Sequence, residues 1–236
     1  MRVARFLSGS RAYGYATSGS DYDYREIHLA PFWKVASGMY LVKPKRGEGD
    51  TVSFELGHFA SLCLKGSPNN VELLFLPPEF AEIDDRLEPL ISMRRDFLNL
   101  QYQHAISHYC LDEMKALRRD IAAVRDMLGG DVSNRVLRAP KRLAHCFRLL
   151  NTGIELRNGL DLNVRRPEAE YLLRVRENPQ EVFGGDDVMS GVSRGLVEAE
   201  ALLRRFDSLE NLSEAPEGFR ESVAKVVCDI RLAFRS

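Results

Sequence analysis

The stretch SGSRAYGYATSGSDYDY, residues 8–24, decides the fold of the first third of the chain. Its pattern predicts the end of a strand, a Gly-Ser turn, a short helix, a Gly- and Ser-rich turn and the start of a second strand. Apolar and aromatic residues on either side extend the two strands over Val3–Leu7 and Tyr22–Leu29. We therefore expect two neighbouring strands joined through a compact, polar connection.

Gly9 and Ser10 lie where the first strand ends and the short helix begins. A glycine lets the backbone approach a ligand closely, and free N–H groups at a helix start favour anions. The hydroxyl of Ser10 adds another donor, so a phosphate group would fit here. The alternative is that Ser10 only caps the helix.

Asp21 and Asp23 are two residues apart at the entry of the second strand. On a strand their carboxylates point to one face, roughly 6.6 Å apart along the chain. Such a pair suits a hard divalent cation, and Mg²⁺ bound together with substrate phosphates is the usual case. The alternative is an ordinary Asp-containing turn, although aspartate is depleted in strands.

The organisation of the chain changes near residue 97. Before it, strands are expected at Thr51–Phe54 and at Met39–Val42, with a polar turn over 44–49 and short helices at Glu55–Lys65 and Asn70–Leu76. After it, apolar residues recur with helical period. The expected helices are Phe97–Leu128, which would end at Gly129-Gly130, then Leu137–Asn158, Pro167–Glu177, Val188–Phe206 and Pro216–Phe234. The fold class is therefore α+β, with a small mixed β-sheet domain at 1–96 and an all-helical domain at 97–236 that completes a cleft.

Composition excludes several classes of protein. The 236 residues carry 33 Lys+Arg and 34 Asp+Glu, so the net charge of −1 does not indicate general affinity for nucleic acid. No apolar run has the length of a membrane helix, and the start has no signal-peptide pattern. The four cysteines, Cys63, Cys110, Cys146 and Cys228, are far apart in the sequence, which predicts buried thiols. Together with the missing signal-peptide pattern, this predicts a cytoplasmic protein without membrane partners.

The spacing of Gly-Ser, ten residues and Asp-x-Asp resembles the signature of the DNA polymerase β-type nucleotidyltransferase superfamily. The run GSRAYGYATSGSDYDYREI (9–27) is similar to a branch of bacterial and phage nucleotidyltransferases with relatives in RNA repair. The segments at 50–75 and 141–156 resemble later parts of that branch. The resemblance covers residues 1 to about 160; a glycine of the branch is replaced by Glu26, and its Asn-Pro by Ser67-Pro68.

The resemblance implies two-metal nucleotidyl transfer with Mg²⁺, or Mn²⁺ in its place. It assigns Asp21 and Asp23 as catalytic metal ligands and requires a third carboxylate on a later strand. Asp50 fits that role best, and Glu55 is the alternative, because strand alternation places these two side chains on opposite faces. Gly9, Ser10 and Arg11 would bind the nucleotide.

Lys141, His145 and Arg148 are spaced i, i+4 and i+7, on one side of a helix whose segment 133–154 contains five basic and no acidic residues. The resemblance implies that these three also bind nucleotide. The alternative is a solvated helix face.

The function expected is transfer of a nucleoside monophosphate from an NTP to a hydroxyl, with release of pyrophosphate. The acceptor stays open among an RNA or tRNA 3′ end, a protein and a small molecule such as an aminoglycoside. A second hypothesis is a nucleotide-binding regulatory or antitoxin-like module of the same fold without turnover. A third is an interaction protein that binds a partner through its helical half.

Overall fold

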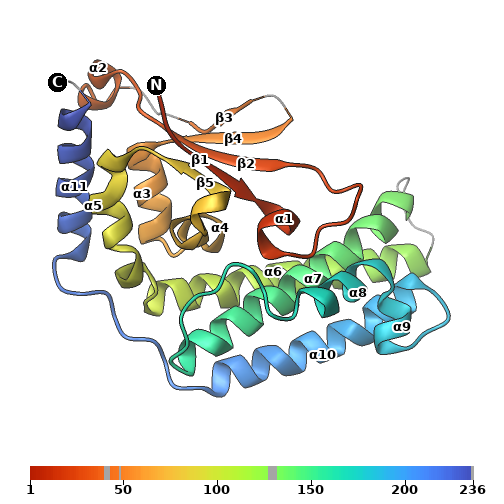
Figure 1. Cartoon of the computed structure of the whole chain (residues 1–236). Coiled ribbons are helices and arrows are strands. Elements are labelled where there is room, and N and C mark those ends of the chain that lie inside the picture. Colours follow the sequence, from red (N-terminus) through yellow and green to blue (C-terminus); the bar gives the residue numbers. More distant parts are fainter. Residues whose placement is uncertain (40–42, 48, 127–131, 235–236) are drawn as a thin grey trace. The chain divides into compact units, whose positions relative to one another are not determined.

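The computed structural model describes residues 1–39, 43–47, 49–126 and 132–234, and it has the expected α+β architecture (Figure 1). A mixed five-stranded sheet with helices is followed by a largely helical region. The chain forms two compact units, the first made of Met1–Ala105 with Leu212–Ser236 and the second of Ile106–Asn211. The first unit thus includes the C-terminal helix, whereas we expected a single division at 96/97.

The sheet of the first unit has the strand order β3-β4-β2-β1-β5. Strand β1 pairs antiparallel with β2 and β5, β3 pairs antiparallel with β4, and β2 and β4 run parallel. The strands are β1 (Arg2–Ser8), β2 (Asp23–His28), β3 (Lys45–Arg46), β4 (Asp50–Glu55) and β5 (Ala81–Ile83).

The two faces of this sheet differ in polarity because side chains alternate along each strand. Phe6 and Ile27 lie on the buried face and are 1% and 2% exposed. On the other face Glu26 forms an ion pair with Arg2 at 3.0 Å, and the Arg5 guanidinium lies 3.8 Å from the centroid of the Tyr24 ring. This alternation explains why short, mixed strands form a sheet with one apolar side.

Helices cover the apolar face of the sheet (Figure 1). Helix α3 packs on β2 and β4, and α11 packs on α3 and α5. The helices of this unit are α1 (Gly9–Tyr13), α2 (Phe32–Ala36), α3 (Leu56–Leu64), α4 (Pro68–Val71), α5 (Glu88–Ser92) and α11 (Phe219–Ala233).

A buried ion pair joins the end of the sheet to the C-terminal helix. Glu55 ends β4, accepts a hydrogen bond from the backbone N–H of Gly57 at 2.8 Å and so caps α3. Its other carboxylate oxygen pairs with the guanidinium of Arg231 on α11. Both side chains are almost fully buried, so the pair ties α11 to the first unit.

The second unit is a set of packed helices. Helix α10 packs on α7 and α9, and α8 packs on α7 and α9. The helices are α6 (Leu100–Arg125), which begins in the first unit, α7 (Val132–Arg157), α8 (Ala169–Glu177), α9 (Pro179–Phe183) and α10 (Val188–Ser208). Glycines allow this packing: a Cβ on Gly191 would lie 2.3 Å from the backbone N of Gln180, so α9 can rest directly on α10 only because that atom is absent.

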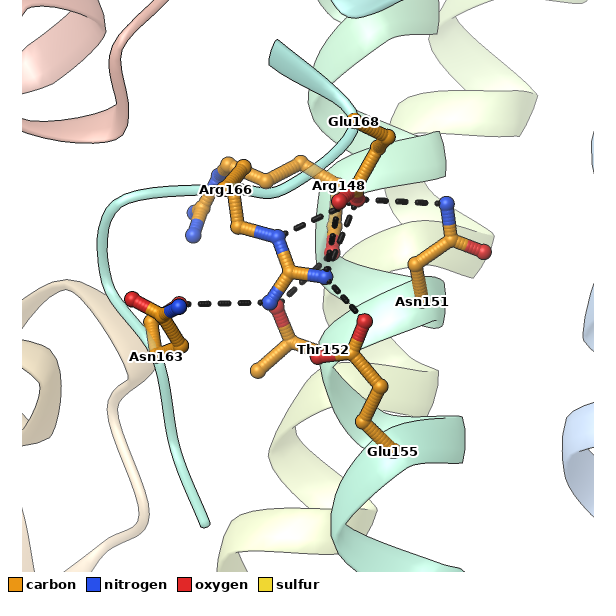
Figure 2. A network of polar contacts seen from close by, with 7 residues as sticks. All are labelled: Arg148, Asn151, Thr152, Glu155, Asn163, Arg166 and Glu168. Atoms are coloured by element: carbon orange, nitrogen blue, oxygen red, sulfur yellow. Dashed lines mark hydrogen bonds and ion pairs between the residues drawn. The ribbon is translucent and has the colours of Figure 1, made fainter. Parts of the chain in front are cut away.

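A buried arginine holds the loop between α7 and α8 (Figure 2). The Arg166 guanidinium donates to Glu155 on α7 at 2.6 Å, to Glu168 at 3.0 Å and to the carbonyl of Asn163 at 3.2 Å. Its side chain is 0% exposed. Figure 2 shows the side chain of Arg148 extending from α7 across the same loop. Because a buried guanidinium is costly unless it is paired, this set of bonds fixes the loop in one position.

Most long helices and the main strands agree with the sequence expectations. The expected helix Leu137–Asn158 begins earlier, at Val132, and continues through Pro140. The polar turn over 44–49 contributes the short strand β3, and the elements α2, β5, α5 and α9 were not predicted. The expected strand Met39–Val42 and the expected helix end at Gly129-Gly130 lie mostly or wholly outside the described residues.

The cysteines only partly match the expectation of buried thiols. Cys63, Cys110 and Cys146 are buried and free, whereas Cys228 on α11 is exposed and free. Burial raises the pKa of the Cys63 thiol well above its ordinary value. Among the described helices, none is both long enough and apolar enough to cross a membrane.

Replacing Arg231 by alanine should strongly destabilise the first unit. The change leaves the Glu55 carboxylate buried without its cation, and loss of one member of a buried pair costs about 3 kcal/mol. Urea unfolding followed by circular dichroism would measure the free energy of unfolding. Lys225→Ala, an exposed change on the same helix, serves as the control and should alter it by less than about 0.5 kcal/mol. Equal stabilities of the two variants would contradict the role given to the ion pair.

Candidate functional site

The centre of the site is set by the register of three neighbouring strands. Ser8 at the end of β1 is paired with Asp23 at the start of β2, and Asp23 is paired with Asp50 at the start of β4. Adjacent strands lie about 4.8 Å apart, and directly paired residues present their side chains on the same face. The Ser8 hydroxyl also donates to the carbonyl of Asp23 at 3.2 Å. One edge of the sheet therefore carries two carboxylates side by side.

Gly9 lies directly against the carboxylate of Asp23. A Cβ built on Gly9 would be only 2.1 Å from Oδ2 of Asp23, and its φ of +68° is unfavourable for other residues. The glycine therefore permits both the turn into α1 and the approach of the Asp23 carboxylate to the backbone. Ser10 follows as the second residue of α1.

Asp50 and Glu55, the two candidates for a third carboxylate, occupy opposite ends of β4. Asp50 is exposed and lies beside Asp23. Glu55 is 3% exposed, pairs with Arg231 and caps α3. The buried carboxylate thus has structural partners, and the exposed one faces the same edge as Asp23.

Asp21 lies on the loop before β2, and Arg11 holds this loop in place. The Arg11 guanidinium donates to the carbonyls of Ser20 at 2.6 Å and of Asp21 at 3.3 Å. It also lies 3.8 Å from the centroid of the Tyr22 ring, a cation–π contact. Arg11 thus positions the loop that carries Asp21, and its binding of nucleotide stays a prediction.

The carboxylates at this edge have the right chemistry for a hard cation. Asp21, Asp23 and Asp50 offer oxygen ligands, which Mg²⁺ prefers. In the described part of the chain, however, no three Asp, Glu, His or Cys side chains are close enough to form a ready metal cluster. The chemistry of these donors fits a divalent cation, and binding would require the three carboxylates to come closer together than they are in the described structure.

The family model for the RNA repair pathway DNA polymerase beta family, RlaP, matches residues 3–181. The chain belongs to this family. The match contains every sequence-predicted site residue. It begins at β1 and ends within α9, so it extends through most of the helical region as well as the sheet.

The comparison with solved structures returned a nucleotidyltransferase-like protein from Exiguobacterium sibiricum 255-15. The two chains share 16% identity, the TM-score is 0.39, and the match covers 86% of this chain and 69% of the other. A comparison with curated proteins found no match. Membership of the family therefore rests on the family model.

Two tyrosines near the site belong to the core. Tyr13 and Tyr15 are 8% and 7% exposed, and their rings stack with centroids 5.9 Å apart. The Tyr13 hydroxyl donates to Oε2 of the buried Glu72 at 3.0 Å. Sequence reasoning did not find this last contact; the only signal was an acidic residue within the apolar run Val71–Phe75.

The three α7 residues that were expected to form a basic row, Lys141, His145 and Arg148, differ in their exposure to solvent. Lys141 is exposed, but Arg148 is only 1% exposed and lies in the network of Figure 2. The ring of His145 packs edge-on against Tyr109 with centroids 5.0 Å apart, and its Nε2 is buried without a hydrogen bond. Burial and the nearby Arg148 hold the pKa of His145 well below its ordinary value. Of the three residues, only Lys141 presents an exposed positive charge.

Gly9→Ala should lower the activity of the site about 100-fold. The new methyl group would displace the Asp23 carboxylate, and a shift of about 1 Å at a reacting centre can lower a rate about 100-fold. Nucleotidyl transfer and metal-dependent NTP binding would be measured. Gly19→Ala is the control, because a Cβ at Gly19 has no neighbour within 4 Å. Activity of Gly9→Ala equal to that of Gly19→Ala would remove Gly9 from the site.

The stability of the protein should fall as the pH drops below about 6.5. His145 is neutral in the folded state and takes up a proton more readily when unfolded, so acid favours unfolding in the range between its folded and unfolded pKa values. Stability is unaffected by this group above about pH 6.5. His145→Phe should therefore flatten the dependence of unfolding free energy on pH, whereas the exposed His108→Phe should not. An unchanged slope in His145→Phe would contradict the pKa direction.

Proposed function

We propose that this protein transfers a nucleoside monophosphate from an NTP to a hydroxyl group at an RNA end. The observation that supports it most is the strand register of Ser8, Asp23 and Asp50, with Gly9 against the Asp23 carboxylate. In the reaction the acceptor oxygen forms a bond to the α-phosphorus. The bond from this phosphorus to the oxygen that bridges to the β-phosphate breaks, and pyrophosphate leaves.

Each residue of the edge has a distinct task in this proposal. Gly9 and Ser10 bind the β- and γ-phosphates through backbone and hydroxyl donors. Asp50 accepts the proton of the attacking hydroxyl, because it is exposed and adjacent to Asp23, whereas Glu55 is already bound in the core. Arg11 keeps the Asp21 loop in place through its two carbonyl contacts.

Asp21, Asp23 and Asp50 would hold Mg²⁺ or Mn²⁺. When bound, the cation neutralises charge on the triphosphate and increases the acidity of the attacking hydroxyl. The neighbouring carboxylates of Asp23 and Asp50 repel one another, and a bound divalent cation would offset that repulsion.

The choice of RNA as acceptor follows from the family, which is described by its role in an RNA repair pathway. We place the reaction in the cytoplasm, where Mg²⁺ and NTPs are available. A protein hydroxyl and a small molecule are the competing acceptors, and a module that binds NTP without turnover is the competing function. One assay separates these possibilities.

The purified protein would be incubated with each α-labelled NTP, Mg²⁺ or Mn²⁺, and separate pools of RNA, protein and aminoglycosides. Label should enter RNA, and Asp23→Asn and Asp50→Asn should each reduce the rate about 100-fold, because several kcal/mol of charge stabilisation are lost. Glu55→Gln should retain transfer wherever it folds. Label in another pool would change the acceptor, NTP binding without transfer would favour the regulatory module, and transfer that survives Asp50→Asn would overturn its assignment.

A further inference from the structure

The second unit contains a groove that has no part in the proposed chemistry. It has a volume of about 560 Å³, within the range of ligand sites. Its walls come from α7, α8, α9 and α10, all in the second unit. The residues that matter here are Phe147, Tyr171, Phe183, Arg194, Glu198 and Arg205.

One side of this groove is a preformed aromatic wall. The rings of Phe147 and Phe183 stack with centroids 5.6 Å apart and an interplanar angle of 13°, and Tyr171 meets Phe147 edge-on at 5.8 Å. Gly195 makes the arrangement possible, since a Cβ there would lie 2.7 Å from the Phe183 ring. Tyr171 and Phe183 are partly exposed, so aromatic surface is available to a ligand.

The other side of the groove is one face of α10. Arg194, Glu198 and Arg205 are spaced i, i+4 and i+11, close to whole helical turns, and all three are exposed. Within the described residues, the side chains of both arginines lack hydrogen bonds and ion pairs. Two exposed guanidinium groups beside an aromatic wall suit a ligand that carries both negative charge and flat rings.

We propose that this groove binds a segment of single-stranded RNA, with a base against the aromatic wall and phosphates on Arg194 and Arg205. The RNA class rests on the proposed function. The two arginines are eleven residues apart, roughly 16 Å along the helix axis. A polynucleotide that follows α10 can place a separate phosphate at each arginine.

Glu198 supports the same orientation of the strand. Its carboxylate lies between the two arginines in sequence and would repel a phosphate at the middle of the groove. It can instead accept a hydrogen bond from a base amino group or a ribose 2′-hydroxyl. Burial and the Glu198 charge raise the pKa of Tyr171, so its hydroxyl stays protonated as a donor.

The test is the affinity of the full chain for a short fluorescein-labelled single-stranded RNA, measured by fluorescence anisotropy. The double variant Arg194→Ala, Arg205→Ala should bind about tenfold or more weakly, and Tyr171→Ala should also weaken binding. Arg204→Ala is the matched control: it is an exposed arginine on the same helix outside the groove lining, and it should change affinity less than about twofold. Equal affinities of the double variant and the control would overturn the proposal.

The salt dependence of binding gives a readout that a purely structural role would not change. Loss of two phosphate contacts should reduce the slope of log K against log salt by about 1.4. Competition by unlabelled AMP that matches competition by the oligonucleotide would instead indicate a mononucleotide site. An acidic peptide that displaces the RNA equally well would show general anion binding, and both results would contradict the proposal.

The outcome can be separated from that of the proposed function. NTP binding at the Asp23 edge should be unchanged in the groove variants, while Asp23→Asn should leave the affinity for RNA unchanged. A wild-type protein that binds RNA through Arg194 and Arg205 but transfers no nucleotide would contradict only the proposed nucleotidyl transfer. Transfer that proceeds with no detectable binding of RNA at low salt would contradict only the proposed RNA groove.

Discussion

The pairing of β2 with both of its neighbours is the constraint on which the candidate site depends. Because β1 runs antiparallel to β2 and β4 runs parallel to it, the end of one strand and the starts of two others meet at one edge. A slip of one residue in either pair would turn a carboxylate to the opposite face of the sheet. The apolar face resists such a slip, since Phe6 and Ile27 would then leave the core.

The charged residues of this protein fall into a buried group with structural bonds and an exposed group, a division that the net charge of −1 does not reveal. Glu55 and Arg166 are buried and fully engaged in structural bonds, one at a helix start and one in a loop. Asp50 on the same strand as Glu55 is exposed, and so are the arginines of the α10 groove. Burial therefore separates structural charges from those that are available to a ligand.

The fold class and most long elements could be predicted from the sequence because they depend on local patterns: strand alternation, helical period and glycine-rich turns. The proximity of Asp23 and Asp50 is a matter of parallel pairing over a long connection, which no local pattern encodes. The burial of Arg148 could not be predicted from the sequence either, because its helical spacing with Lys141 resembles that of an exposed basic row. The position of α11 in the first unit could not be predicted either, because its ion pair joins Arg231 to Glu55, which is 176 positions away in the sequence.

The discontinuous first unit has a consequence for the order in which the chain is made. Along the chain, the sheet and α3 precede the second unit, and α11 follows it. Until α11 has been synthesised, the Glu55 carboxylate lacks Arg231 and the surfaces of α3 and α5 that α11 covers remain exposed. The second unit can therefore fold before the first unit is complete.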